Sequence, residues 1–144
     1  MKNLFLTLAL GFATLFASAQ NFMVVTNYNA PEDGAEWEMS SLTDNMGIGY
    51  SINDTWTVGF IKAGEDSLGD ANYDLFGRYN WNTEMYISVQ APTEEMMDNL
   101  TVGLGYSFNA WKGLYVEPNY SMGLKEDANG DREGTFNLGL AYRF

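Results

Sequence analysis

Bulky apolar residues alternate with small or polar residues along eight segments of this chain. A period of two residues is that of an extended strand, because successive side chains of a strand point to opposite faces. No stretch sustains the period of an amphipathic helix. The chain is therefore predicted to be all-β, with strands over residues 21–28, 46–53, 55–63, 73–81, 85–91, 100–109, 114–124 and 135–144.

The connections between these segments are alternately long and short. The long ones cover residues 29–45, 64–72, 92–99 and 125–134, and the short ones lie near 53–54, at 82–84 and at 110–113. Long loops at one end and tight turns at the other describe an up-and-down antiparallel meander. Eight such strands can close into a barrel whose interior holds little beyond its own side chains.

The two faces of the predicted strands differ in size more than in charge. One face carries Leu, Ile, Val, Met and aromatic residues, and the other mostly Gly, Ser, Thr and Asn. A soluble barrel would turn the bulky face inward, but a sheet face in water normally carries many Lys and Glu side chains. Small residues suit a narrow lumen, so the bulky face is predicted to contact lipid. Four apolar residues are expected to point inward and plug the lumen: Met23, Val25, Ile61 and Phe76.

Aromatic residues gather near the short turns. Rings with an apolar body and a polar tip favour headgroup depth in a bilayer, so a belt at one membrane interface is expected there. A soluble aromatic core would place its rings at strand centres instead. The predicted belt consists of Trp56, Tyr79, Trp81, Tyr106, Phe108 and Trp111, with Tyr142 and Phe144 nearby.

One residue conflicts with a regular strand. Pro118 lies in the outward series of the seventh segment and has no N–H to donate to a neighbouring strand. Because a bulge is the usual way to accommodate such a proline, we expect a β-bulge at this position.

The first 19 residues have the three parts of a cleaved export signal. Lys2 supplies the positive charge, residues 4–16 form the apolar run, and Ala17-Ser18-Ala19 forms a small-residue cleavage site. A transmembrane helix is the alternative, but the run is short of the roughly 20 apolar residues that a bilayer requires. We expect a cleaved signal peptide over residues 1–19 and one barrel domain over residues 20–144.

The export signal, the eight alternating strands and the final stretch "TFNLGLAYRF" together resemble the small eight-stranded outer-membrane β-barrel proteins of Gram-negative bacteria. The resemblance covers residues 20–144 and implies an eight-stranded antiparallel up-and-down transmembrane β-barrel in the cell outer membrane. In that family, a terminal aromatic residue preceded by apolar residues at every second position is the signal read by the outer-membrane assembly machinery. The positions that match this signal are Leu138, Leu140, Tyr142 and Phe144.

All but four of the 19 acidic residues lie in the long connections. A solvated surface explains this pattern, and so does divalent-cation binding, because Ca²⁺ and Mg²⁺ take carboxylate oxygens. The best local candidate is the stretch "DANGDREG", with Asp127, Asn129, Asp131 and Glu133 at alternate positions. It is similar to the start of a helix-loop-helix calcium loop, but Arg132 and Leu138 stand where that loop has Gly and its bidentate Glu. A plain hairpin turn is the alternative.

Three charged residues are predicted to meet inside the barrel: Glu117, Arg78 and Arg143. The seventh and eighth strands are hairpin neighbours, so a suitable register would put Glu117 beside Arg143, while Arg78 reaches across the lumen. A buried ion network would satisfy these charges and plug the interior, because burial of an unpaired charge is unfavourable. The functional alternative is a gate, in which breaking the pair opens a narrow path for ions.

Composition bears on partners and on chemistry. The formal net charge of −12 disfavours nucleic acid, whose phosphates need clustered Lys and Arg. The chain has no His, the side chain that most often carries general acid–base catalysis near neutral pH, so no enzymatic activity is expected. We expect a monomer with a structural or cell-surface interaction role, whose partners are outer-membrane lipids and the assembly machinery. The acidic loops would bind divalent cations or lipid headgroups, and no other cofactor is expected; the alternative is a narrow, gated, porin-like pore or small-solute transport protein.

Overall fold

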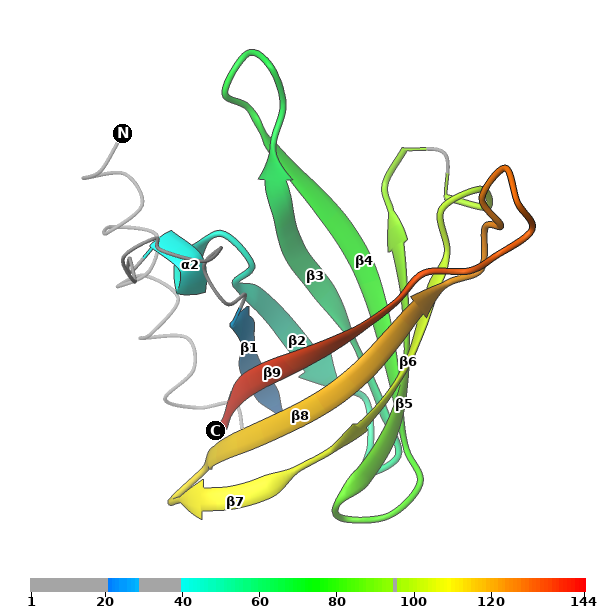
Figure 1. The fold of residues 1–144 in the computed structure, drawn as a ribbon. Coiled ribbons are helices and arrows are strands. Elements are labelled where there is room, and N and C mark those ends of the chain that lie inside the picture. The colour runs from blue at the N-terminus through cyan, green and yellow to red at the C-terminus, as the bar shows by residue number, and fades with distance from the viewer. Residues whose placement is uncertain (1–20, 29–39, 95) are drawn as a thin grey trace, which may run out of the picture.

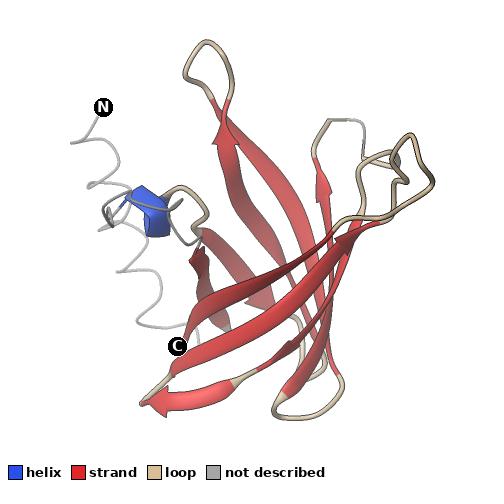
Figure 2. Ribbon diagram, in the orientation of Figure 1, coloured by secondary structure: helices blue, strands red, loops and turns tan. Residues whose placement is uncertain are grey.

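The computed structural model describes residues 21–28, 40–94 and 96–144. These residues form strands around a common axis and one short helix, α2 (Ser40–Thr43) (Figures 1 and 2). The strands are β1 (Phe22–Tyr28), β2 (Gly47–Ser51), β3 (Trp56–Glu65), β4 (Ala71–Asn80), β5 (Met85–Pro92), β6 (Thr101–Tyr106), β7 (Phe108–Trp111), β8 (Leu114–Gly123) and β9 (Gly134–Arg143).

The sheet closes on itself. Neighbouring strands pair antiparallel in the order β6-β5-β4-β3-β2-β1-β9-β8-β7, and β6 also pairs with β8. Because β6 and β7 both pair with β8, they are two parts of one strand. The fold is therefore an eight-stranded antiparallel up-and-down β-barrel, as predicted. Figure 1 shows the β3–β4, β5–β6 and β8–β9 loops at one end of the barrel and the tight turns at the other.

The sixth strand is interrupted at Ser107, opposite the part of β8 that contains Pro118. Gly105 pairs with Asn119 and Phe108 with Val116, so the register is the same on both sides of the interruption. No extra residue is inserted there, and Pro118 pairs with Leu138 in an unbroken register with β9. The predicted bulge at Pro118 is therefore wrong. A proline removes one donor without forcing an insertion, and the irregularity lies instead between Asn109 and Trp111.

The β7–β8 turn is tighter than predicted. β7 continues to Trp111, which pairs with Leu114, so the connection consists of Lys112 and Gly113 alone. Both residues have positive φ, 24° and 88° respectively, as in the type I′ turns that join two-residue hairpins. The other strand ends lie within a few residues of the predicted ones.

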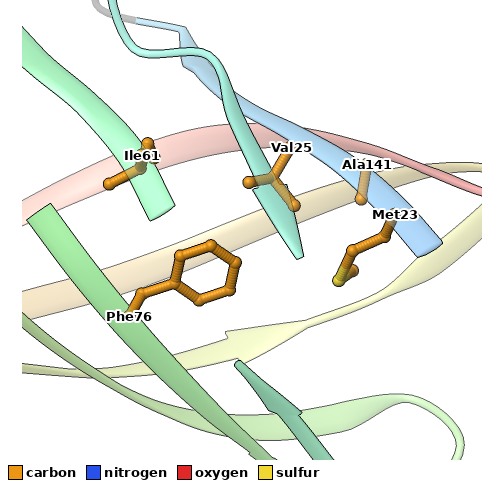
Figure 3. Close-up of a cluster of buried hydrophobic side chains, with 5 residues drawn as sticks. All are labelled: Met23, Val25, Ile61, Phe76 and Ala141. Carbon is orange, nitrogen blue, oxygen red and sulfur yellow. The ribbon is translucent and has the colours of Figure 1, made fainter. Parts of the chain in front are cut away.

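The inner face of the barrel holds a small apolar cluster on β1, β3, β4 and β9. Figure 3 shows its side chains pointing toward one another across the lumen. It contains the four residues predicted to point inward and one more: Met23, Val25, Ile61, Phe76 and Ala141. The predicted inward positions of the four residues are confirmed, and the cluster lies along the inner wall formed by β1, β3, β4 and β9.

The short helix α2 is tied to the barrel wall. The Thr26 hydroxyl on β1 donates a 2.5 Å hydrogen bond to the Leu42 carbonyl, which anchors the β1–β2 connection. In the part of the chain that the structure describes, no helix is both long and apolar enough to cross a membrane.

Candidate functional site

The centre of the lumen is occupied by one carboxylate that binds two guanidinium groups. Arg78 on β4 donates from Nη1 and Nη2 to Glu117 Oε1 and Oε2 at 3.0 and 2.9 Å. Arg143 Nη2 on β9 donates to Glu117 Oε1 at 2.8 Å. Glu117 is 2% exposed and Arg78 is 7% exposed, so the fork-shaped pair between them is almost fully excluded from solvent. The three residues that the sequence predicted to meet inside the barrel do meet.

The register that brings them together differs from the expected one. Glu117 on β8 pairs with Gly139, four residues before Arg143, so backbone pairing does not place the two charges side by side. The long Arg143 side chain spans the difference along the lumen. Gly139 leaves open the space beside Glu117 that a larger inward residue would fill, since a Cβ there would lie 3.0 Å from the Glu117 carbonyl oxygen.

Ser107 is a fourth member of the network. Its hydroxyl donates to Glu117 Oε1 at 2.6 Å and accepts a 2.9 Å hydrogen bond from Arg143 Nη2. Ser107 lies where β6 gives way to β7, so the interruption of the sixth strand and the charged network occupy the same level of the barrel. The alternation placed Ser107 on the inner face, but nothing in the sequence marked it as a partner of Glu117.

Two tyrosine rings cover the guanidinium groups. The Arg78 Cζ atom lies 3.9 Å from the centroid of the Tyr86 ring, and the Arg143 Cζ atom lies 4.0 Å from that of Tyr115. The negative faces of these rings attract the cations and help to offset the second positive charge, which Glu117 alone does not balance. Sequence reasoning missed both tyrosines. Each lies two residues before an inward polar residue, Ser88 or Glu117, and strand periodicity alone would have found them.

Polar side chains continue the lining of the lumen toward the long loops. The Asn137 side-chain amide donates to Ser121 Oγ at 3.1 Å and to Asn119 Oδ1 at 3.3 Å. Near the same end, Gln90 Nε2 donates to Asp74 Oδ2 at 2.7 Å. The lumen therefore has an apolar sector lined by β1, β3, β4 and β9 and a polar sector lined largely by β4, β5, β8 and β9.

The candidate cation loop is built as a hairpin turn. Asp127 Oδ1 accepts hydrogen bonds from the backbone N–H groups of Asn129 and Asp131, at 2.8 and 2.9 Å. The β3–β4 loop repeats this geometry, because Asp66 Oδ1 accepts from the N–H groups of Leu68 and Asp70 at the same distances. Both loops share the pattern Asp-x-x-Gly-Asp, with the glycine at positive φ. The common pattern reflects turn formation, which occupies one Asp127 oxygen.

The other candidate residues of this loop remain at the surface. Asp131 and Glu133 line a hollow at the barrel mouth, and Arg132 pairs with Glu126 at 2.9 Å. Within the described ranges, no three acidic side chains lie close enough together to hold a metal ion.

The residues of the predicted aromatic belt lie near the end of the barrel that carries the tight turns. Trp81 and Trp111 are 71% and 67% exposed, and Trp56, Tyr79 and Phe108 are exposed to a lesser degree. The rings of Trp56 and Tyr79 meet edge to face, with centroids 4.9 Å apart. Tyr106 is half-buried, packs against Phe108 at 4.4 Å and donates its hydroxyl proton to Glu84.

Three residues of the predicted assembly signal, Leu138, Leu140 and Tyr142, lie along the outer face of β9, and Phe144 follows the strand directly. Leu138, Tyr142 and Phe144 are exposed and Leu140 is half-buried, while Gly139 and Ala141 between them are buried. β9 pairs with both β8 and β1, so these side chains lie at the closure of the barrel. Their recognition by assembly machinery remains a prediction. The predicted signal peptide and residues 29–39 of the first long loop lie outside the described residues.

No protein-family model and no curated protein matches this chain. Among solved structures, the chain is similar to the Yersinia pestis outer membrane protein Ail, determined in a phospholipid bilayer nanodisc. The TM-score is 0.45 and the sequence identity 16%, over 87% of this chain and 99% of Ail. The class of protein defined by the described strands is that of closed eight-stranded antiparallel β-barrels.

Proposed function

We propose that this chain is a small β-barrel protein of the bacterial outer membrane, with a structural or cell-surface interaction role. The observation that carries the proposal is the inversion of the barrel, in which many large apolar side chains face outward while charged and polar side chains are buried in the lumen. Phe60, Leu104 and Phe136 are 58%, 60% and 73% exposed, whereas Thr57, Arg78 and Glu117 are buried. An apolar exterior of this extent is unfavourable in water and suits lipid.

A detergent gel tests the membrane assignment. A folded barrel that resists detergent migrates differently from the same chain after boiling. Identical migration of boiled and unboiled samples, together with solubility in buffer without detergent, would contradict the proposal.

The closed lumen favours a surface role over transport. The apolar cluster and the Glu117 network together occupy much of the interior, and Arg78 and Glu117 are almost fully buried within it. The acidic loops are then the part of the molecule that is available to partners. We propose that they bind divalent cations, which would bridge loop carboxylates to the phosphate groups of lipids. A cation that is bridged in this way needs fewer ligands from the protein, because the phosphate oxygens of the lipid complete its coordination.

Calorimetric titration tests the cation proposal. Calcium added to the refolded barrel in phosphate-containing lipid should release or absorb heat that is lost when Asp131 and Glu133 are changed to Asn and Gln. Asp127 is left unchanged, because its carboxylate shapes the turn. Heat that persists in the double variant would exclude this loop as the site.

The β9 residues support a proposal about assembly. Deletion of Phe144 should reduce insertion into the outer membrane in cells while leaving refolding into synthetic lipid largely intact. Equal loss in both settings would indicate a structural role alone, because the Phe144 N–H also donates to the Phe22 carbonyl at 3.0 Å.

A narrow gated pore is the second candidate. The observation in its favour is that one carboxylate binds two guanidinium groups. A change at Glu117 alone would therefore break both ion pairs. Single-channel recording in a planar bilayer distinguishes the two candidates. A silent wild type and a silent Glu117→Ala variant support the structural role, whereas conductance in either one supports the pore.

A further inference from the structure

The lumen contains a cavity above the charged network. Its volume is about 70 Å³, and strands from most of the barrel contribute to its wall. One ordered water needs roughly 10–15 Å³ of such space, so the cavity has room for several waters. Ser88, Gln90, Asn119, Asn137 and other polar side chains line most of it, and each can bond to water.

The same cavity continues to the mouth of the barrel. A larger hollow of about 510 Å³ lies between the ends of β6, β8 and β9 and the β8–β9 loop. Thr101 and Ser121 line both the hollow and the inner cavity, so the two spaces meet at these residues. The inner cavity is thus reached from the end of the barrel that carries the long loops.

The inner end of the cavity holds a buried donor without an acceptor. Arg78 uses both Nη atoms to bind Glu117, but its Nε atom has no hydrogen-bond partner among the described residues. Arg78 is 7% exposed and lines the cavity. Because a buried N–H group without an acceptor is costly, the geometry calls for a small acceptor at this point, and water is the one that fits the space.

Arg78 and Glu117 form the inner end of the cavity. Two inward residues nearer the tight turns lie beyond them: Ser107, whose hydroxyl is hydrogen-bonded within the network, and Ala141, which belongs to the apolar cluster. Ser107 and Ala141 are 4% and 1% exposed. Neither residue lines the two cavities.

We propose that the outer half of the lumen is a water-filled vestibule with a closed floor at Arg78, which admits water and small cations from the long-loop end only. The charges along it support this selectivity. Carboxylates of the β8–β9 loop outnumber Lys125 at the mouth, and Arg78 lies at the floor together with Glu117. Arg78 and Arg143 share that one carboxylate, so the floor keeps a net positive charge. Anions are repelled at the mouth and cations at the floor, so neither sign of ion crosses.

Cysteine accessibility tests the vestibule, because the chain has no native Cys. Ser121→Cys, Ser88→Cys, Ser107→Cys and Ala141→Cys are each refolded into nanodiscs and treated with silver ion, a small thiol-binding cation. After removal of free silver, the protein is unfolded, and the remaining free thiols are counted with a maleimide. Silver should protect the cysteines at 121 and 88 many times faster than those at 107 and 141. Gln90→Cys replaces Ser88→Cys if the latter does not fold.

Two results would overturn the proposal. Protection at position 88 as slow as at the buried position 141, while position 121 reacts fast, would mean that the inner cavity is closed to water and small cations. Protection at positions 107 and 141 as fast as at position 121 would mean that the lumen has no floor. The silver-protection pattern can also be measured on the barrel folded in detergent micelles. A result that contradicts the vestibule proposal can therefore be distinguished from a failure of the protein to insert into lipid.

The effect of the carboxylates at the mouth is tested separately, by comparing a neutral and a negatively charged alkylating reagent. At Ser121→Cys, neutral iodoacetamide should alkylate several-fold faster than iodoacetate, which has almost the same size and a negative charge. The ratio, corrected by the same pair of rates on a free thiol, should fall toward one in high salt, because salt screens the loop carboxylates. A corrected ratio of one at low salt would contradict the proposed selectivity for cations.

Discussion

Glu117 illustrates at the scale of one residue how a small barrel satisfies charge in its interior. Its two oxygens accept hydrogen bonds from Arg78, Ser107 and Arg143, and two tyrosine rings face the guanidinium groups. Removal of the carboxylate would leave Arg78 buried without its counter-charge. The net stabilisation that a buried ion pair contributes is small compared with the penalty for removing one of its partners. The stability of the barrel is therefore expected to be sensitive to a change of any single charged residue in the network.

We therefore expect Glu117→Gln to lower the free energy of unfolding by about 3–5 kcal/mol. Urea titration of the barrel refolded in lipid vesicles would measure this loss. Glu126→Gln is the matched control, because Glu126 pairs with Arg132 at 2.9 Å but both side chains are exposed. That change should cost no more than about 1 kcal/mol. Equal losses in the two variants would show that the lumen network is not desolvated.

Gly105 and Gly77 provide a second contrast between single residues. A Cβ at Gly105 would overlap the ring of Tyr86, which covers Arg78 on its other side, whereas a Cβ at Gly77 would meet nothing within 4 Å. Gly105→Ala should destabilise the barrel by about 1–3 kcal/mol through overpacking. Gly77→Ala should be neutral or stabilise by up to about 1 kcal/mol, since glycine is unfavourable within a strand. The same urea titration decides, and a stable Gly105→Ala variant would mean that Tyr86 can move freely.

At the scale of the elements, strand positions were predictable and irregularities were not. A period of two residues marks each strand because one face of the wall contacts a different medium from the other. The interruption at Ser107 and the irregularity near Trp111 depend on which strand lies opposite and in which register, and no local pattern records this. The candidate site divides in the same way. Inward alternation identified Glu117, Arg78 and Arg143, but the contacts of Tyr86 and Tyr115 follow from how the strands align across the lumen.

The Lys112-Gly113 turn allows a test at this scale. Lys112 has a positive φ of 24°, which is unfavourable for a lysine, and the type I′ turn favours Asn followed by Gly. Lys112→Asn should therefore raise the free energy of unfolding by roughly 0.5–1 kcal/mol. Gly113→Ala should lower it by about 1–2 kcal/mol, because the φ of 88° suits glycine and a Cβ would lie 2.6 Å from the Arg143 carbonyl oxygen. Opposite signs for the two variants confirm the turn type, and a destabilising Lys112→Asn contradicts it.

At the scale of the whole molecule, the barrel is polarised along its axis. Exposed aromatic rings gather at the end with tight turns, and most carboxylates lie in the loops at the other end. This polarity supports the proposed placement in a membrane, with the acidic loops in solvent and the aromatic rings at one interface. The proposed contact of the wall with lipid would also account for the few charges between the two ends.

Fluorescence quenching by brominated lipids tests this arrangement. In variants that retain one tryptophan at a time, Trp56, Trp81 and Trp111 should be quenched more strongly by bromines close to the headgroups than by bromines near the acyl-chain ends. Amphipathic indole rings favour that depth. Stronger quenching by the deep bromines would place the belt within the hydrocarbon core, and no quenching by either would remove it from the bilayer.

The pairing of β1 with β9 has a consequence for the timing of folding. These strands are the first and last of the described chain, and their pairing runs from Met23 with Arg143 to Tyr28 with Leu138. A ribosome delivers β1 long before β9, so the edge of β1 that β9 later covers stays unpaired until the last strand has been made. Exposed edges of this kind invite aggregation. The barrel therefore cannot close before β9 has been synthesised, and until then the free edge of β1 can pair with other chains.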